Sequence, residues 1–462
     1  MLDKSAEKPY NIKDLKKTIW NRRNSKVIKT VKFGGSSLAN CEQFKKVKDI
    51  ITADPARRYV VPSAPGKRHK NDFKITDKLY ECYELASKGK DISECFGHIT
   101  DRYDEIISGL GLDYSLAEEY ESIKYALLHN AGRDYMASRG EYLNALILAK
   151  YLGYDFVNAK NVIFFKDDGT FDSERTNEQL SAVLKEHETA VIPGFYGSMP
   201  NGTIKTFSRG GSDITGSIVA RAAEADIYEN WTDVSGFLMA DPRIVDNPRT
   251  IDTITYRELR ELSYMGATVL HEDAIFPVRI AKIPINIKNT NDPSAKGTMI
   301  VSHADYDNNG SITGIAGKKD FSFITIEKDM MNTEVGFGRR VLEVFENAGI
   351  SFEHIPSGID TMSVVVKTEC LKNKRSRIIN DIKEAVNPEC VSVEDGLALI
   401  AIVGRNMVRA KGTAAKVISA IADADINIRM LDQGSSEMNI IIGVDSCDFE
   451  STMRAIYSAI EK

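Results

Sequence analysis

Short apolar runs alternate with longer amphipathic stretches through most of the chain. β-branched residues dominate the run that ends at Phe33, and similar short runs occur at Tyr59–Pro62, Thr189–Pro193, Asp226–Trp231 and Ile283–Lys288. Longer segments between them, such as Tyr142–Leu152 and Asp213–Ala225, predict helices. Strands that alternate with helices predict an α/β fold, a mainly parallel sheet between two layers of helices. Ligands of such sheets bind beyond the carboxyl ends of the strands, so glycine-rich segments after strands are the first candidate sites.

The pattern changes after the polar stretch Ser302–Gly310, which is typical of a linker. Beyond it, residues 336–365 align without a gap on residues 412–441, at an offset of 76. Both copies predict a helix, a strand, a turn and a second strand. Two copies are too few for a solenoid, so we expect two small α+β modules packed on each other. The alternative is a chance similarity between amphipathic segments.

Composition and charge narrow the class of protein. The chain has 462 residues, 42% of them hydrophobic and 27% charged, as in a soluble globular protein of about three domains. Its net charge of −6 gives no reason to expect nucleic acid as a partner, and no apolar run is long enough for a membrane helix. Six cysteines without a CxxC pair indicate reduced thiols in the cytoplasm rather than disulfides or a zinc site.

The first 26 residues differ from the rest of the chain. They are polar and basic and lack the apolar core of a secretory signal. We therefore expect residues 1–26 to form an extension outside the fold, with one short helix around Ile12–Arg22.

The first glycine-rich segment, Lys32–Ser37 (KFGGSS), follows a predicted strand and precedes a predicted helix, Cys41–Ile51. Glycines let backbone N–H groups approach phosphate oxygens, and a helix N-terminus adds positive potential. Lys32, at the strand end, is placed to reach a transferring phosphoryl group. The chain has neither a Walker A loop nor a G-x-G-x-x-G fingerprint, which disfavours P-loop and Rossmann chemistry. Alone, such a segment is most often a simple turn.

Two further segments have structural as well as functional interpretations. Phe207–Asp213 (FSRGGSD) opens a predicted helix, whose N-cap would be Ser212 or Asp213. Ser138–Glu141 (SRGE) matches a capping box, with its serine as the N-cap and its glutamate three positions on. The functional interpretations are a second phosphate-binding turn in the first segment and, in the second, a carboxylate that binds a substrate ammonium group.

Together with Trp231–Arg243 (WTDVSGFLMADPR) and Gly266–His271 (GATVLH), these motifs resemble the amino-acid kinase superfamily, and within it the aspartokinases. Five motifs in one order make the resemblance specific. It runs from about Lys26 to Lys462 and includes a C-terminal pair of ACT modules, which matches the repeat. It implies an amino-acid kinase fold followed by two α+β ACT modules, with domains at 27–301, 311–395 and 396–462, a linker at 302–310, and one strand shared between the modules.

The resemblance implies ATP-dependent phosphorylation of the side-chain carboxylate of L-aspartate to 4-phospho-L-aspartate, the first step of lysine, threonine and methionine biosynthesis, with ATP and Mg²⁺ as cofactors. A carboxylate with a pKa of about 4 is ionised at neutral pH, so no general base is required. What remains is to bring two anions together and to neutralise charge in the transition state. No homoserine dehydrogenase domain is expected after Lys462, which favours a monofunctional enzyme.

The alternatives are another small-acid kinase of the same fold and an inactive ACT-type amino-acid sensor. The sensor is disfavoured because Lys32, Glu141, Arg209 and Asp213 are all present.

The resemblance also implies roles for individual residues. Lys32 and Asp213 are expected to be catalytic, and Asp213 would orient cationic groups or hold Mg²⁺ rather than abstract a proton. No motif for direct metal ligation by the protein is expected. The expected ATP-binding residues are Lys32, Gly34, Gly35, Ser36, Thr232, Asp233, Leu238, Arg243 and Thr268. The expected aspartate-binding residues are Ser37, Ser63, Glu141, Phe195, Arg209 and Ser212, with Arg209 on the α-carboxylate and Glu141 on the ammonium.

Three positions depart from the family pattern. Thr268 stands where the family often has lysine, Glu272 replaces the usual proline, and Leu238 stands where an aromatic residue is often found. These departures bear on nucleotide affinity and base selectivity rather than on the phosphoryl transfer.

For the ACT pair, the resemblance implies feedback regulation by an end-product amino acid. It also implies at least a homodimer formed through the ACT modules, with a tetramer left open. The candidate effector-binding residues are Gly336, Phe337, Gly338, Glu353, Ser357, Asp360 and Thr361. A helix N-terminus suits the effector's carboxylate, and the acidic side chains suit its ammonium groups. This favours lysine, while threonine, alone or together with lysine, stays open.

Overall fold

The computed structural model describes residues 27–208, 210–267, 270, 272–305, 311–434 and 436–461. The short helix predicted around Ile12–Arg22 lies outside the described residues, as do residues 306–310 of the predicted linker. The chain divides into two compact units: a first unit of Met1–Phe237, Thr250–Tyr256 and Val269–Asp305, and a second unit of Leu238–Arg249, Arg257–Thr268 and Tyr306–Lys462. No helix in the described part of the chain is long and apolar enough to span a lipid bilayer.

An eight-stranded sheet forms the centre of the first unit, in the order β3-β4-β2-β1-β7-β9-β10-β8. All its pairings are parallel except β9–β10. The strands are β1 (Lys29–Phe33), β2 (Arg57–Pro62), β3 (Asp155–Phe156), β4 (Ala190–Val191), β7 (Ile227–Thr232), β8 (Thr253–Thr255), β9 (Ile285–Asn289) and β10 (Thr298–Val301). The predicted mainly parallel sheet is confirmed, and each of the five predicted apolar runs contributes one strand.

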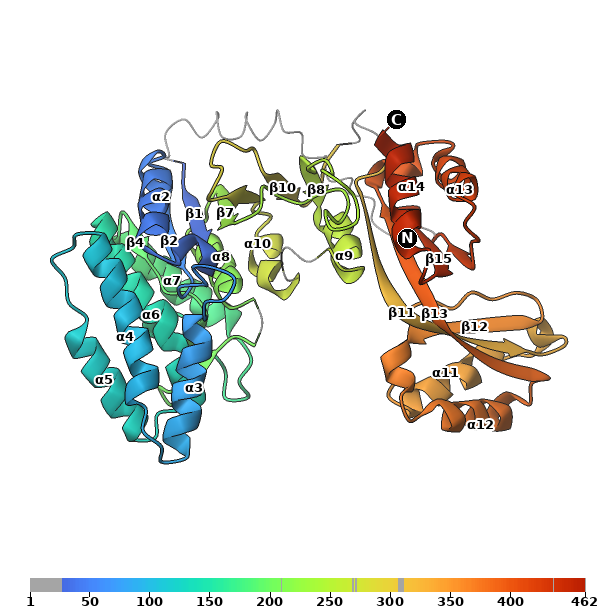
Figure 1. The fold of residues 1–462 in the computed structure, drawn as a ribbon, viewed down its shortest axis with the longest axis horizontal. Helices are drawn as coiled ribbons and strands as arrows, with labels where there is room; N and C mark the ends of the chain where they lie inside the picture. The colour runs from blue at the N-terminus through green and yellow to red at the C-terminus, as the bar shows by residue number, and fades with distance from the viewer. Residues whose placement is uncertain are drawn as a thin grey trace. The chain divides into compact units, whose positions relative to one another are not determined.

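Helices cover both faces of this sheet, and α3, α4, α5 and α6 lie together (Figure 1). The helices are α2 (Cys41–Thr52), α3 (Ile75–Ser87), α4 (Ser93–Gly109), α5 (Ala117–Leu128), α6 (Arg133–Leu152), α7 (Ser173–Glu186), α8 (Gly211–Ala222) and α10 (Phe276–Ile280). Successive strand residues point to opposite faces. Accordingly, Val60 packs with α2 and α6, whereas Tyr59 and Val61 pack with α7 and α8. A small antiparallel pair, β5 (Tyr196–Ser198) and β6 (Ile204–Thr206), lies outside the main sheet.

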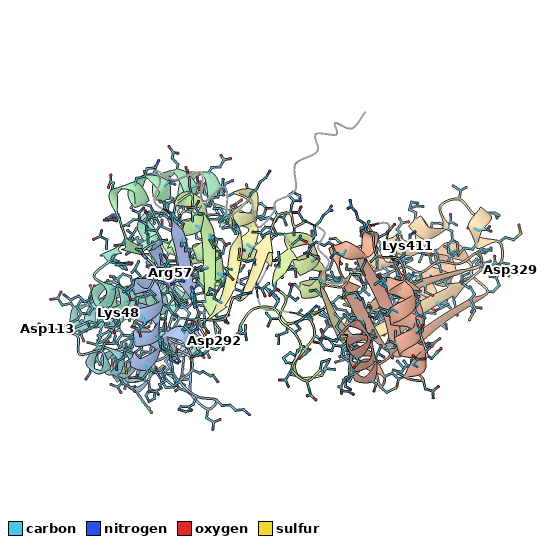
Figure 2. All side chains as sticks on the ribbon, turned by 90° about the horizontal axis from the view of Figure 1, so that it is seen from above. Lys48, Arg57, Asp113, Asp292, Asp329 and Lys411 are labelled. Atoms are coloured by element: carbon cyan, nitrogen blue, oxygen red, sulfur yellow. The ribbon has the colours of Figure 1, made fainter. Side chains whose placement is uncertain are left out.

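The α2 face of the sheet buries a charge cluster around Glu229. The Nε of Arg57 donates to Glu229 Oε2 over 2.8 Å, and the Nζ of Lys29 donates to Oε1 over 3.2 Å. The indole Nε1 of Trp231, on the same face of β7, donates to Oε2 over 2.9 Å. Figure 2 shows Arg57 inside the first unit, whereas Asp113 lies at its outer edge. Glu229 and Trp231 thus face α2, and the intervening Asn230 faces α8.

Two predicted N-caps are wrong. Helix α6 begins at Arg133 with Gly132 as its N-cap, so Ser138 lies inside it and the predicted capping box does not exist. The Ser138 hydroxyl instead donates to the carbonyl of Tyr135, since the three-residue spacing of a capping box is also a spacing within one helix face. Helix α8 has Gly210 as its N-cap, in the left-handed conformation, and Ser212 and Asp213 fall in its first turn.

The second unit contains one antiparallel sheet, in the order β12-β11-β13-β15-β14. Its strands are β11 (Gly314–Glu327), β12 (Thr361–Lys367), β13 (Cys390–Val403), β14 (Met430–Asp432) and β15 (Asn439–Asp445). Its helices are α11 (Phe337–Asn347), α12 (Arg375–Val386), α13 (Thr413–Asp423) and α14 (Phe449–Glu461), and α9 (Tyr256–Tyr264) continues into it from the first unit. The two repeat copies share this sheet, because β11 and β13 each have 14 residues and pair along both copies.

The structure reproduces the internal repeat. Helices α11 and α13 begin at Phe337 and Thr413, positions 76 apart, and both follow a left-handed glycine N-cap with φ of 83° and 86°. In the second copy the strand before the turn is β14. In the first copy it is reduced to two bridges, His354 to Val365 and Ser357 to Met362.

The loop between β2 and α3 is fixed by a buried arginine. Arg102 on α4 is 2% exposed. It pairs with Asp72 Oδ2 through Nη2 over 2.7 Å and donates to the carbonyl of Gly66 through Nη1 over 3.1 Å. Burial raises the pKa of the Asp72 carboxyl, but hydrogen bonds from Arg68 and the charge of Arg102 hold that pKa well below its usual range. The conformation of this loop is therefore stabilised by a buried ion pair.

We expect Arg102→Gln to lower the free energy of unfolding by about 3 kcal/mol, because it removes one cation from a buried pair. The folded-state pKa of Asp72 is depressed, so its stabilisation is complete above the unfolded pKa of about 4 and declines as pH falls further. The effect of Arg102→Gln should therefore shrink in acid. Urea unfolding followed by tryptophan fluorescence, at pH 7 and at pH 3, measures both effects.

The control for this measurement is Lys45→Gln, which breaks an exposed pair with Glu42 on α2. It should leave the unfolding midpoint nearly unchanged. Equal losses in the two variants, or an Arg102→Gln effect that does not depend on pH, would contradict a stabilising role for the buried pair.

Candidate active site

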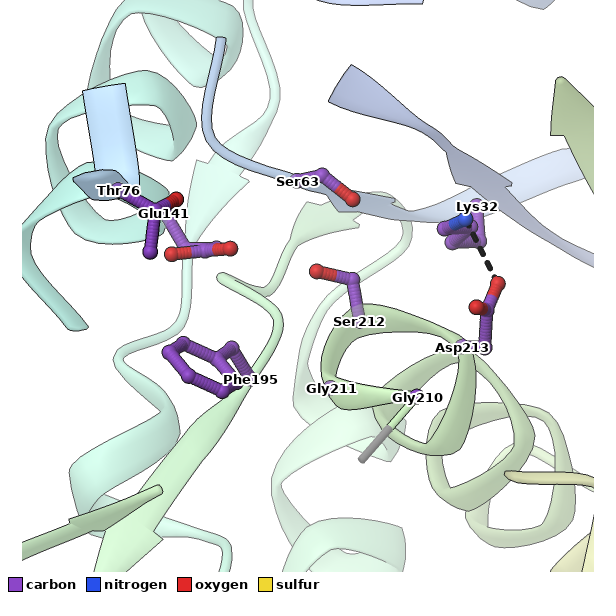
Figure 3. A pocket seen from close by; sticks show the side chains of 9 residues that line it. All are labelled: Lys32, Ser63, Thr76, Glu141, Phe195, Gly210, Gly211, Ser212 and Asp213. Atoms are coloured by element: carbon purple, nitrogen blue, oxygen red, sulfur yellow. Dashed lines mark ion pairs between the residues drawn. The ribbon is translucent and has the colours of Figure 1, made fainter. Parts of the chain in front are cut away.

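A pocket of about 280 Å³ opens at the carboxyl ends of β1 and β2, next to the start of α8 (Figure 3). It is lined by Lys32, Ser63, Thr76, Glu141, Phe195, Gly210, Gly211, Ser212 and Asp213. Six of these residues are predicted site residues: Lys32, Ser63, Glu141, Phe195, Ser212 and Asp213. The sheet brings them together from five separate segments of the chain, because strand ends and helix starts meet at this edge.

An ion pair forms one side of the pocket. The Nζ of Lys32 on β1, a residue 7% exposed, lies 2.6 Å from Oδ1 of Asp213 on α8. It also lies 3.5 Å from Oδ1 of Asn230, its register partner on β7. The side chains of Lys32 and Asn230 point to the α8 face, so the start of α8 places Asp213 against both. Figure 3 shows this pair on the opposite side of the pocket from Glu141.

Glu141 supplies a buried carboxyl group at that opposite side. It lies on α6 and is 6% exposed. Burial raises its pKa to about 8, and the Ala64 backbone, the charge of Arg139 and the Ser212 hydroxyl oppose this only in part. Among the described residues, its Oε2 has no hydrogen-bond partner. A buried carboxylate without a partner is costly, so this position favours a cationic ligand group such as ammonium.

Close packing of α6 against the end of β2 sets the position of Glu141. A Cβ on the preceding residue, Gly140, would lie 2.8 Å from the Cβ of Ala64, so only glycine fits there. Four residues beyond Gly140, the Nδ2 of Asn144 donates to the carbonyl of Ser63 over 2.6 Å. The glycine of the SRGE segment is thus explained by the approach of two backbones.

The turn before α8 is shaped around Phe195. This residue has a φ of 81°, in the left-handed region that residues other than glycine rarely adopt. Its N–H donates to Thr215 Oγ1 over 3.0 Å, and its carbonyl accepts from the N–H of Phe207 over 2.9 Å. A Cβ on Gly211 would collide with the Phe195 ring. Gly211 therefore leaves room for an aromatic wall that is held in a strained backbone conformation.

The KFGGSS segment forms a short 3₁₀ turn, Gly35–Leu38, directly after β1. A Cβ on Gly35 would lie 2.9 Å from the carbonyl oxygen of Ala64, and the Gly35 carbonyl accepts from the N–H of Gly66 over 2.8 Å. Helical backbone leaves its first N–H groups without intrahelical partners, which suits Gly35 and Ser36 to an anion. Ser37 does not line the pocket, because its Oγ lies 2.7 Å from Oγ1 of Thr290.

The predicted nucleotide residues are divided between the two units. Thr232 is the last residue of β7 and Asp233 follows it, both in the first unit, and Thr232 Oγ1 donates to Asp233 Oδ1 over 3.1 Å. Leu238 and Arg243 belong to the second unit, and Arg243 pairs with Asp241 over 2.6 Å. The predicted site residues Arg209 and Thr268 lie outside the described residues.

Sequence reasoning missed two residues at the pocket. Thr76, in the first turn of α3, lines it, and Asn230 contacts the Lys32–Asp213 pair from β7. Nothing in the local sequence singles out Thr76. Asn230 had a detectable signal, since an asparagine inside a buried strand has to find hydrogen-bond partners.

The candidate effector residues lie in the first ACT copy of the second unit. Gly336 is the N-cap of α11, and Phe337 points into the hydrophobic core. The two acidic side chains, Glu353 half-buried and Asp360 exposed, are already hydrogen-bonded. Glu353 Oε2 accepts from the Tyr264 hydroxyl over 2.6 Å, and Asp360 Oδ1 accepts from the N–H of Met330 over 2.8 Å. Among the remaining candidates, Gly338 lies in the first turn of α11, Ser357 lies in the segment before β12, and Thr361 is the first residue of β12.

Comparisons with known proteins agree with this architecture. Residues 28–289 match the Amino acid kinase family, and residues 400–460 match an ACT domain. Aspartokinase 3 of Bacillus subtilis is 40% identical over 445 residues, which cover 93% of this chain and 98% of that protein. The chain is also similar to a crystal structure of Clostridium acetobutylicum aspartate kinase, with 53% identity, a TM-score of 0.86, and coverage of 94% of this chain and 100% of that one.

Two structures of Escherichia coli aspartokinase III resemble the chain with a TM-score of 0.70, each covering 94% of this chain and 100% of that one. One, 25% identical, is a complex with aspartate and ADP in the R-state, and the other, 26% identical, is a complex with lysine and aspartate in the T-state. From the family match over the catalytic region and the identity to a full-length relative, the chain belongs to the amino acid kinase family and, within it, to the aspartokinases.

Proposed function

We propose that the pocket lined by Lys32, Glu141 and Asp213 is where this aspartokinase transfers phosphate from ATP to the side-chain carboxylate of L-aspartate. The observation that carries the proposal is the placement of two different polar groups at opposite sides of the pocket. A buried carboxyl group lies on one side of a cavity of about 280 Å³, and a lysine at the phosphate-loop strand lies on the other. Aspartate carries a cationic group and a nucleophilic carboxylate at opposite ends, so it suits this polarity.

At the substrate side, Glu141 binds the α-ammonium group, and the hydroxyls of Ser63 and Ser212 donate to the substrate. Phe195 closes one wall and excludes water. By resemblance to the family, Arg209 binds the α-carboxylate through its planar guanidinium fork. The substrate's side-chain carboxylate is then directed toward Lys32. It needs no deprotonation, so positioning and charge neutralisation are what the pocket contributes.

At the phosphate side, Lys32 neutralises charge on the transferring phosphoryl group, and the backbone of Gly34, Gly35 and Ser36 holds the phosphates. Within the described part of the chain, no three His, Cys, Asp or Glu side chains lie close enough together to hold a metal ion. Mg²⁺ commonly binds through one or two carboxylates together with substrate phosphates, and Asp213 fits that arrangement. Thr232, Asp233, Leu238, Arg243 and Thr268 are the proposed contacts of the remaining nucleotide.

In the second unit we propose ACT modules at 311–395 and 396–462, following a catalytic domain at 27–301 and a linker at 302–310. The modules bind an amino-acid effector at the first copy, with lysine favoured over threonine. The lysine complex of E. coli aspartokinase III supports this assignment. We also propose that the chain forms at least a homodimer through these modules and acts in the cytoplasm.

Aspartate-dependent ADP release should require Lys32. We expect Lys32→Ala to lower kcat by about 10² to 10³, as when one preorganised charge is lost from a transition state. A coupled ADP assay with a panel of amino acids and small acids measures this and separates the alternatives. Lys185→Ala, an exposed change on α7, is the control. Turnover of another acid but not of aspartate would point to a different kinase, and no turnover at all to a sensor. A Lys32→Ala variant with more than a tenth of the original kcat would exclude the proposed role.

Aspartate binding should release a proton. The raised pKa of about 8 keeps Glu141 mostly protonated at pH 7, and a bound ammonium favours its ionised form. Calorimetric titrations at pH 7 in buffers of different ionisation enthalpy should therefore show release of roughly one proton per aspartate. The release should disappear above pH 9 and in Glu141→Gln. Binding without proton exchange at pH 7 would contradict an ammonium contact at Glu141.

Inhibition by an effector should depend on the acidic residues of the first ACT copy. We expect lysine to inhibit the unaltered enzyme, and Glu353→Ala or Asp360→Ala to weaken inhibition by roughly 5- to 150-fold while leaving uninhibited kcat nearly unchanged. Inhibition curves with lysine and threonine, singly and together, test this. Asp381→Ala, a half-buried position on α12, is the control. Unchanged curves in both variants would refute the proposed effector contacts.

A further inference from the structure

Asn230 is a polar residue inside a buried strand. It lies in the middle of β7 and is 3% exposed. Its neighbours Glu229 and Trp231 point to the α2 face, whereas Asn230 points to the α8 face, where Lys32 is its register partner on β1. A buried carboxamide has two donor hydrogens and one acceptor oxygen to satisfy. The contacts of this side chain therefore define its role.

Those contacts form a triangle with the ion pair of the pocket. The Nδ2 of Asn230 donates to Asp213 Oδ1 over 2.8 Å, and its Oδ1 lies 3.5 Å from the Nζ of Lys32. The Lys32 ammonium is 2.6 Å from the same Asp213 Oδ1. Carboxylates only accept and ammonium groups only donate, so chemistry fixes which end of the amide faces each partner. One oxygen of Asp213 is thus shared by two donors.

We propose that Asn230 is a positioning residue for phosphoryl transfer. By occupying Asp213 Oδ1 together with Lys32, it fixes the rotation of the carboxylate, so that the second oxygen, Oδ2, is directed to cations of the reaction. It also fixes the Lys32 ammonium at the strand end. This inference rests on the proposed function of the pocket and extends it to a strand position outside the glycine-rich motifs.

The amide suits this position because it carries no charge. Asparagine supplies a donor to Asp213 and an acceptor to Lys32 without adding to the charge of the pair. An ionised aspartate at 230 would repel Asp213 and compete for Lys32. A protonated aspartate would restore one donor and one acceptor in nearly the same shape. Leucine would keep the volume and remove both contacts.

The test compares kcat at saturating aspartate and ATP, from pH 5.5 to 9, in the unaltered enzyme, Asn230→Leu and Asn230→Asp. We expect Asn230→Leu to lose roughly 10- to 100-fold in kcat, as expected for a misplaced catalytic group, with the KM for aspartate changed less than twofold. Asn230→Asp should be poor at pH 8 and recover toward acid pH, up to tenfold per pH unit, because protonation of the new carboxyl restores the contacts.

Asn286→Asp is the matched control. Asn286 lies on the neighbouring strand β9 and pairs in register with Glu229. The substitution Asn286→Asp therefore makes the same chemical change in the same sheet, at a position that does not face Asp213. It should leave the shape of the pH profile unaltered. Circular dichroism and tryptophan fluorescence confirm folding of each variant. If Asn230→Asp does not fold, Asn230→Leu decides whether Asn230 is a positioning residue: a lower kcat with a nearly unchanged KM for aspartate supports this role, and an unchanged kcat refutes it.

The outcomes also separate this inference from the function on which it rests. If Lys32→Ala keeps its turnover, the proposed function itself fails. If Lys32→Ala is inactive while Asn230→Leu keeps kcat and Asn230→Asp follows the original pH profile, only the role of Asn230 is refuted. A pH profile shifted equally in Asn230→Asp and Asn286→Asp would also refute it, because buried charge alone would then explain the change.

Discussion

A lysine can be buried at the end of a strand only if an anion lies next to it, because an uncompensated charge in the interior is very costly. In this protein Asp213 meets that requirement for Lys32. The pairing demands a fixed register between β1 and β7 and a helix α8 that starts close to β1. The left-handed Gly210 that caps α8 places Asp213 in the first turn of that helix, and the register of β1 on β7 brings Asn230 beside Lys32. The pocket, its glycines and its aromatic wall all depend on the position of that helix start.

Much of this arrangement could be predicted from the sequence, because it depends on local patterns. The apolar runs identify five strands of the sheet, and the glycine-rich segments locate the strand ends where six predicted residues line one pocket. The prediction of a capping box was wrong because the spacing of Ser138 and Glu141 also occurs inside a helix. Only the start of α6 at Arg133 shows that both residues lie within the helix rather than at its N-terminus. Asn230 and Thr76 were missed because their importance comes from cross-strand register and loop closure, which no local pattern encodes.

The glycines in this site serve packing more visibly than phosphate binding. Gly140 and Gly35 are required because α6 and the KFGGSS turn both press against the Ala64 segment, and Gly211 is required by the ring of Phe195. A glycine-rich motif can therefore mark a functional site indirectly: it shows where backbones must meet to hold polar side chains in place. The chemistry of the site is carried by residues next to those glycines rather than by the glycines alone.

The two ACT copies share their longest strands, β11 and β13, in one sheet. The first half of β11, Gly314–Lys318, pairs with Leu399–Val403 of β13, and that part of β13 also pairs with β15. The second half of β11, Phe321–Glu327, lies between β12 and the first half of β13, and the register changes between Lys318 and Ser322. Neither copy contains a complete sheet of its own. Because the copies share their strands, one copy cannot simply be removed. Truncation after Val403 would leave the edge of β13 that pairs with β15 unpaired, and an open strand edge of this kind promotes aggregation. The second unit is therefore preserved or lost as one piece, and its two copies can diverge in sequence only as long as the shared strands stay intact.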